Sequence, residues 1–110
     1  VLNAQIGERL QGTYQIRPSS DSPYNQFSFL IVDENSISLQ VDGVVLFRYE
    51  PMEVNEDSSM ILKCILYRGQ LPSNEMLKFR YTINFIELND HIQVSIAHKN
   101  VNKNIDVKRL

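Results

Sequence analysis

The sequence predicts an all-β protein whose seven or eight antiparallel strands follow one another as an up-and-down meander and close into a small barrel. Three observations support this prediction. Apolar residues recur at every second position along most of the chain, as in strands with one buried face. Short polar turns separate these segments at regular intervals. Long crossing connections are few, and a meander removes its exposed edges when it closes on itself.

Length and composition set the scale of the fold. The chain has 110 residues, of which 43% are hydrophobic and 22% are charged. Such a chain can bury a sizeable core without disulfides or metal, and its composition is that of an ordered globular protein. We therefore expect a single barrel domain over residues 1–110, with an N-terminal helical turn in residues 1–11 and the strands in residues 12–110.

The first segment has the spacing of a helix. Leu2, Ile6 and Leu10 recur at every fourth position. Asn3 suits the N-cap of a short helix, and Gly12 suits the position just past its end. We expect a helical turn here that covers one hydrophobic end of the barrel.

Two strands follow this turn. Residues 13–17 alternate in polarity, with Tyr14 and Ile16 on one face. A polar loop with two prolines leads to a second strand in residues 26–33. The face of that strand predicted to point inward consists of Phe27, Phe29 and Ile31.

A hairpin is predicted in the middle of the chain. Residues 36–41 alternate strictly between apolar and polar side chains. The pair Asp42 and Gly43 then favours a two-residue turn in which both residues have positive φ. Residues 44–50 form the returning strand, and we expect Pro51 to end it because proline has no N–H for the ladder.

Four more strands complete the prediction. They comprise residues 58–68, 76–88, 91–98 and 105–109, with an asparagine-rich turn at 100–104. In the first of the four, strict alternation places Met60, Leu62, Cys64 and Leu66 on one face and Ile61, Lys63, Ile65 and Tyr67 on the other.

Three residues in this order of elements resemble a known family. Gly12 and Tyr14 lie on the first strand after a helical turn, and Arg109 lies on the last strand. This arrangement resembles the small lipocalin-like (calycin superfamily) barrels, whose hallmark is a Gly-x-Trp on the first strand with a basic residue over the ring. Tyr14 stands at the Trp position. The resemblance implies a barrel, carriage of a small ligand and, together with the absence of an initiator Met, export from the cytoplasm.

The barrel interior supplies the first functional hypothesis, a non-enzymatic binding protein for a small apolar ligand. An eight-stranded barrel is just wide enough for side chains to fill it or for one small ligand to enter its mouth. The size of the inward side chains favours a filled core, so both interpretations stay open. The candidate ligand-binding residues are Tyr14, Phe27, Phe29, Leu62, Phe79 and Tyr81.

The second hypothesis is a protein-interaction module, such as an inhibitor, adaptor or accessory subunit, with a filled barrel. Loops on a rigid scaffold often carry binding residues. Here they include an acidic loop with the candidate partner-binding residues Glu50, Glu53, Glu56 and Asp57. An outer apolar patch is the other candidate surface. Its predicted members are Leu30, Val32, Val45, Phe47, Ile65 and Tyr67.

No motif in the sequence indicates catalysis, a metal site or a cofactor. The four glycines never form a phosphate-binding pattern. His91 and His98 have opposite parity on one predicted strand, which argues against a shared metal ion. Cys64 is a single cysteine in mid-strand, where it is expected to behave as a small buried hydrophobic residue. We therefore expect no enzymatic activity.

Charge and hydropathy exclude two further classes of function. The net charge is −2, and Lys78 and Arg80 alternate with Phe79 and Tyr81, so bases and aromatic rings lie on opposite faces. Single-stranded nucleic acid needs both on the same face, so we do not expect it to bind. A spanning helix requires about 20 consecutive apolar residues, and the sequence contains no such run.

Overall fold

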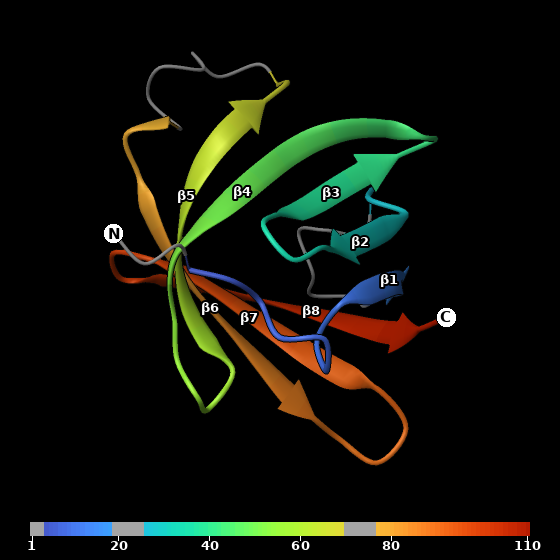
Figure 1. Ribbon diagram of the computed structural model, residues 1–110. Coiled ribbons are helices and arrows are strands. Elements are labelled where there is room, and N and C mark those ends of the chain that lie inside the picture. Colours follow the sequence, from blue (N-terminus) through green and yellow to red (C-terminus); the bar gives the residue numbers. More distant parts are fainter. Residues whose placement is uncertain (1–3, 19–25, 70–76) are drawn as a thin grey trace.

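A computed structural model describes residues 4–18, 26–69 and 77–110 and shows a closed barrel of eight antiparallel strands in chain order (Figure 1). This confirms the predicted fold class. Within these ranges no helix is long and apolar enough to cross a membrane. The strands are β1 (Gly12–Arg17), β2 (Phe29–Val32), β3 (Ile37–Val41), β4 (Val44–Val54), β5 (Ser59–Tyr67), β6 (Arg80–Glu87), β7 (Ile92–His98) and β8 (Val101–Arg109).

The first and last strands close the barrel. β1 pairs with β2 on one side and with β8 on the other, where Tyr14 is the register partner of Arg109. Because successive connections of a meander alternate between its two ends, the N-terminal segment and residues 33–36, 55–58 and 88–91 share one end, called here the plugged end. The β1–β2, β3–β4, β5–β6 and β7–β8 connections share the other end, called here the mouth.

The interior of the barrel is packed with apolar side chains from every strand. Tyr14, Leu39 and Val94 are completely inaccessible to solvent. Burial of this kind is the main favourable term in folding. The largest fully buried side chains are Tyr14, Ile6, Leu30, Ile37, Leu39, Met60, Leu62, Ile83, Ile105, Val32, Val94 and Val107.

The N-terminal segment covers the plugged end, as the sequence predicts. Ile6 and Leu10 are buried in the core, at 1% and 5% exposure. Two i→i+3 hydrogen bonds, Leu10 N–H to the Gly7 carbonyl and Gln11 N–H to the Glu8 carbonyl, make a single tight turn. The Ile6 N–H also donates to the Glu34 carbonyl in the β2–β3 connection. Leu2 and Asn3 lie outside the described residues.

Both residues of the predicted Asp-Gly turn have positive φ. Asp42 and Gly43 have φ values of 51° and 81°, and they connect the paired residues Val41 and Val44.

A second two-residue turn was not predicted. Lys99 has a φ of 55°, and His98 pairs with Val101, so β8 begins at Val101 and the expected asparagine-rich turn at 100–104 is wrong.

The expectation that Pro51 ends its strand is also wrong. β4 continues to Val54, and its register with β5 shifts between Pro51 and Glu53. Met52 is therefore an extra, bulged residue beside the proline, and its side chain is exposed. Proline has no N–H to donate to the neighbouring strand, and a bulge interrupts the ladder locally where that hydrogen bond would be missing. The strand can therefore continue past Pro51.

Strict alternation also fails on β2. Leu30 and Val32 are buried at 0% and 1% exposure, so they face the interior. Phe29 and Ile31 consequently face outward, where they are half-buried. Phe27, which precedes the strand, is buried despite its parity with Phe29, because the regular ladder begins only at Phe29. The predicted inward orientation of Phe29 and Ile31 is therefore corrected.

Candidate functional site

A pocket of about 660 Å³ opens at the mouth of the barrel. Its lining comes from the β1–β2 connection, the end of β3, the start of β4, and the end of β5 with the residues that follow. Ligand sites in proteins commonly have volumes of about 300–1,000 Å³ and mostly apolar walls. The described lining residues are Gln26, Phe27, Val41, Leu46, Phe47, Tyr67, Arg68 and Gly69.

Two β-bulges direct aromatic side chains into this pocket. The register of β3 with β4 shifts so that Leu46 is an extra residue, and Phe47 lies opposite the buried Leu39. The register of β4 with β5 shifts so that Ile65 is extra, and Tyr67 lies opposite Phe47. Residues directly opposite in a ladder share a face, so both rings point inward.

The aromatic rings contact one another and form the apolar wall of the pocket. The ring centroid of Phe47 lies 5.6 Å from that of Phe27, in an edge-to-face arrangement, and 4.9 Å from that of Tyr67. Tyr49 stacks below Phe47 at 6.1 Å and is buried. Such contacts fix the orientation of each ring, so the wall has a defined shape.

Gly69 sets the position of the Tyr67 ring. A Cβ atom added to Gly69 would overlap the hydroxyl and the adjoining ring carbons of Tyr67. The ring therefore lies directly against the backbone of Gly69, in space that any larger residue would occupy. Glycine at this position allows the close approach.

Two of the described lining residues carry polar side chains at the rim of the pocket. Gln26 and Arg68 are both exposed. The backbone of Arg68 is held because its N–H donates to the Leu46 carbonyl at 2.8 Å. Among the residues that the structure describes, no ion pair or side-chain hydrogen bond engages the Arg68 guanidinium.

A second group of rings extends the aromatic layer around the mouth. Tyr81 lies 5.2 Å from Tyr49, and His98 lies 5.3 Å from Tyr81. Phe79 stacks on His98 at 4.1 Å, and the Lys99 ammonium is 5.6 Å from the Phe79 ring centroid. This group lies beside the pocket and does not line it.

The six ligand-binding residues predicted from sequence therefore do not form one site. Phe27 lines the pocket. Tyr14 and Leu62 belong to the packed interior, and Tyr81 and Phe79 belong to the neighbouring aromatic group. Phe29 faces outward. The residues that sequence reasoning missed are Gln26, Val41, Leu46, Phe47, Tyr67, Arg68 and Gly69.

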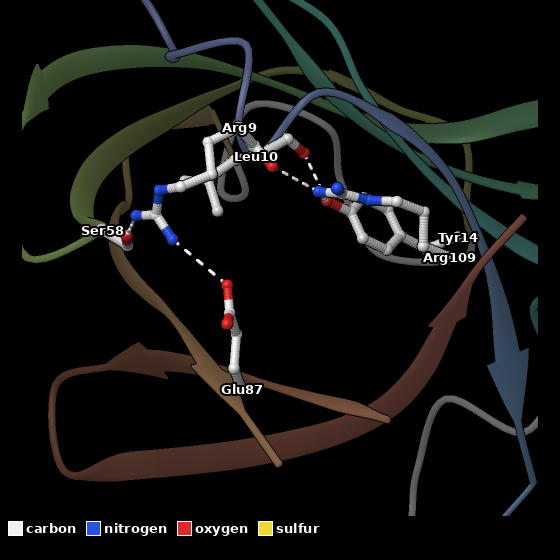
Figure 2. A network of polar contacts seen from close by, with 6 residues as sticks. All are labelled: Arg9, Leu10, Tyr14, Ser58, Glu87 and Arg109. Atoms are coloured by element: carbon white, nitrogen blue, oxygen red, sulfur yellow. Dashed lines mark hydrogen bonds and ion pairs between the residues drawn. The ribbon is translucent and has the colours of Figure 1, made fainter. Parts of the chain in front are cut away.

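Two of the three motif residues, Tyr14 and Arg109, meet at the plugged end (Figure 2). The Arg109 guanidinium carbon lies 5.1 Å from the centroid of the Tyr14 ring, and its Nη2 donates to the Tyr14 hydroxyl at 2.5 Å. The Tyr14 hydroxyl in turn donates to the Leu10 carbonyl. Gly12 has a φ of 145°, a conformation that residues with a side chain rarely adopt.

Arg9 extends this network across the plugged end (Figure 2). Its carbonyl accepts a hydrogen bond from Arg109 Nη2. Its guanidinium donates to Ser58 Oγ in the β4–β5 turn and pairs with Glu87 at 3.2 Å. The N-terminal turn is therefore joined to β1, β4–β5, β6 and β8, which fixes it in place over this end of the barrel.

The four acidic residues predicted to form one loop lie in two different elements of the structure. Glu50 and Glu53 lie on β4, where Glu50 is the register partner of Lys63. Glu56 and Asp57 lie in the β4–β5 turn. Asp57 accepts hydrogen bonds from the N–H and hydroxyl of Ser59, and these bonds lower the pKa of its carboxyl. Asp57 thus stabilises a turn, and the four carboxylates are divided between a strand and that turn.

The predicted outer apolar patch is also corrected. Leu30 and Val32 face the core, and Phe47 and Tyr67 line the mouth pocket. Ile65, the bulged residue, remains exposed at 41%. The patch was predicted by assigning alternate residues to the outer face. The bulges at Leu46 and Ile65, and the start of the β2 ladder at Phe29, turn four of these side chains inward instead.

The remaining candidates for chemistry are separate from one another. Cys64 is buried, which raises the pKa of its thiol, and its Sγ donates to the Leu66 carbonyl. His91 lies at the plugged end between Asp90 and Asp106, and His98 lies at the mouth. Across the described ranges, no three His, Cys, Asp or Glu residues are grouped to hold a metal ion.

Comparisons with known proteins provide no relative. No family model matches the chain, and no curated protein or solved structure matches it significantly.

Proposed function

We propose that the protein is a non-enzymatic binding protein that holds a small apolar ligand in the mouth of its barrel. The observation that carries this proposal is the pocket of about 660 Å³ built around Phe27, Phe47 and Tyr67. The opposite end is closed by Ile6 and Leu10. A ligand therefore enters from the mouth, where its apolar surface replaces water against the three rings.

The composition of the lining supports binding rather than catalysis. The described lining residues include no carboxylate, histidine or cysteine, and their titratable side chains are those of Tyr67 and Arg68. General acid–base chemistry at neutral pH needs a group with a pKa near the working pH. Binding needs only apolar area with a few polar groups for orientation, which this pocket has.

A relationship to the lipocalin-like barrels is part of the proposal. It is supported by the order of elements, a plugging turn followed by Gly12 and Tyr14 on the first strand. It is supported further by Arg109 on the last strand, which lies over the Tyr14 ring. Ligand carriage in the barrel mouth follows from that relationship as well as from the pocket.

Titration with a neutral apolar dye, Nile red, tests the proposal, because its result does not depend on charge. We expect saturable fluorescence enhancement, and a higher melting temperature as the dye concentration rises. The variant Phe47→Leu removes a pocket ring and should weaken dye binding. The matched control is Phe85→Leu, which removes a buried ring that contacts Tyr14 and does not line the pocket.

The two variants separate binding from stability. Phe85→Leu should lower the melting temperature and leave dye affinity unchanged. Absence of saturable binding by the folded protein contradicts the proposal, as does equal loss of affinity in both variants. A folded protein that binds no dye would favour the alternative function, a protein-interaction module with a filled barrel.

A further inference from the structure

We infer that the ligand of the mouth pocket is a planar aromatic carboxylate, with its ring system against Phe27, Phe47 and Tyr67 and its carboxylate paired with Arg68. This inference rests on the proposed function and specifies the chemical class of the ligand. Two independent features of the pocket carry it, the geometry of its rings and the placement of Arg68, the charged side chain among the described lining residues.

The three rings that line the pocket lie at different angles to one another. Phe27 and Phe47 meet at an interplanar angle of 80°, and Phe47 and Tyr67 at 42°. Rings held at such angles offer a flat partner one surface for offset stacking and another for edge-to-face contact. A flexible alkyl chain would gain from the apolar area but not from these orientations, so the wall favours a planar aromatic body.

The charged group among the described lining residues is a cation. Arg68 is the described lining residue with a formal charge, and no ion pair engages it within the described part of the chain. A guanidinium binds a carboxylate with two parallel hydrogen bonds, which is stronger and more directional than a neutral contact. Gln26, also in the lining, has an amide that can donate a further bond to the same group.

The same arginine argues against an aromatic cage for a cation. Rings grouped around a pocket can bind quaternary ammonium groups through their faces. Here a cationic ligand would lie beside the Arg68 guanidinium, and like charges at short range repel. The combination of rings and arginine therefore selects an anionic aromatic compound.

The distribution of charge between the two ends disfavours an anion at the plugged end. The connections at the plugged end contain six acidic residues, Glu8, Asp33, Glu34, Glu56, Asp57 and Asp90, against the single basic residue Arg9. By sequence, the connections at the mouth contain acidic and basic residues in equal number. An anion is repelled from the acidic end and meets no net repulsion at the mouth.

A pair of small molecules of equal shape tests the inference. Naphthoate carries the carboxylate, and naphthylmethanol is its neutral counterpart. We expect calorimetric titration to show that naphthoate binds at least about tenfold more tightly than naphthylmethanol, because hydrogen bonds to a charged group are stronger than those to a neutral one. Added salt should weaken naphthoate binding and leave naphthylmethanol binding unchanged.

Two arginine variants with the same change of charge locate the contact. Arg68→Gln should reduce naphthoate affinity about tenfold and leave naphthylmethanol affinity unchanged. Arg48→Gln is the matched control, because Arg48 lies between the inward Phe47 and Tyr49 on β4 and so faces outward. It should change neither affinity.

The outcomes separate this inference from the proposed function. Equal affinity for the two compounds, or an effect of Arg68→Gln that Arg48→Gln matches, overturns the aromatic carboxylate while Nile red binding still supports the mouth site. Decanoate binding as tightly as naphthoate overturns the planar aromatic body and retains the role of Arg68. If neither naphthoate nor Nile red binds, the proposed function itself fails.

Discussion

Arg109 and Tyr14, which lie near opposite ends of the chain, are register partners on β8 and β1, with the guanidinium carbon 5.1 Å from the centroid of the tyrosine ring. The same two side chains hold the N-terminal turn. Tyr14 donates a hydrogen bond to the Leu10 carbonyl, and Arg109 donates one to the Arg9 carbonyl. The contact between Arg109 and Tyr14 therefore links the closure of the barrel to the covering of its plugged end.

The variant Arg109→Ala tests the strength of this contact. It removes the contact with the ring and hydrogen bonds to both the Tyr14 hydroxyl and the Arg9 carbonyl. We expect a loss of about 2 kcal/mol in the free energy of unfolding, measured by urea denaturation. Lys108→Ala is the control, because the neighbouring side chain is exposed and faces the other way on β8. Equal losses from the two variants would contradict the structural role of Arg109.

Gly12 and Gly7 form a second matched pair. Gly12 has a φ of 145°, so Gly12→Ala should destabilise the barrel by about 1–3 kcal/mol through backbone strain. A Cβ atom on Gly7 meets nothing within 4 Å, and its φ needs no glycine. Gly7→Ala should therefore be neutral or stabilise by about 0.4–1 kcal/mol. Thermal denaturation of both variants measures the difference, and a reversed order would contradict the assignment.

Most of the fold could be predicted because its determinants are local. Alternation of polarity over residues 13–17 and 36–41 gives strands, and Asp42-Gly43 gives a tight hairpin turn, without any knowledge of distant residues. Ile6 and Leu10 show their helical spacing in the same way. Closure between β1 and β8 followed from the meander and the absence of long connections.

The pocket could not be predicted, because its rings depend on register shifts between strands. Simple parity placed Phe47 and Tyr67 on the outer surface. The extra residues Leu46 and Ile65 reverse that parity. A bulge has no sequence signal when its residue is an ordinary aliphatic one, and only the pairing with the neighbouring strand reveals it. Pro51 is a signal for the separate bulge at Met52, which does not change the orientation of Phe47 or Tyr67.

The pH dependence of stability should involve Asp90. The His91 side chain is hydrogen-bonded to the Asp90 carboxyl at 2.7 Å, and this bond is the main reason that the pKa of Asp90 lies below its ordinary value of 3.8. A carboxyl whose pKa is lowered by folding stabilises the protein above the unfolded pKa. That stabilisation disappears as the pH falls through the folded value.

The variant Asp90→Asn should therefore be less stable than the parent at about pH 5, and the difference should vanish towards about pH 2. Urea denaturation across this range measures it. In a His91→Gln background the carboxyl loses its main partner, so the substitution of Asp90 should have little effect at any pH. A difference that grows as the pH falls would contradict the sign of this argument.

Gly69 and Tyr67 should act together on ligand binding. Gly69→Ala places a methyl group where the tyrosine ring now lies, so the ring must move and naphthoate affinity should fall by about tenfold. In a Tyr67→Ala background no ring remains to be displaced, and Gly69→Ala should have no further effect. Calorimetric titration of the four proteins measures this coupling. Additive losses would show that Gly69 acts independently of the ring.

The most direct test of the mouth site is a titration of isotope-labelled protein with naphthoate, followed by amide chemical shifts. We expect the largest changes at Phe27, Val41, Phe47, Tyr67 and Gly69, which line one end of the barrel. Amides at the plugged end, such as Leu10 and His91, should not move. Changes centred on the plugged end, or no saturable changes at all, would contradict it.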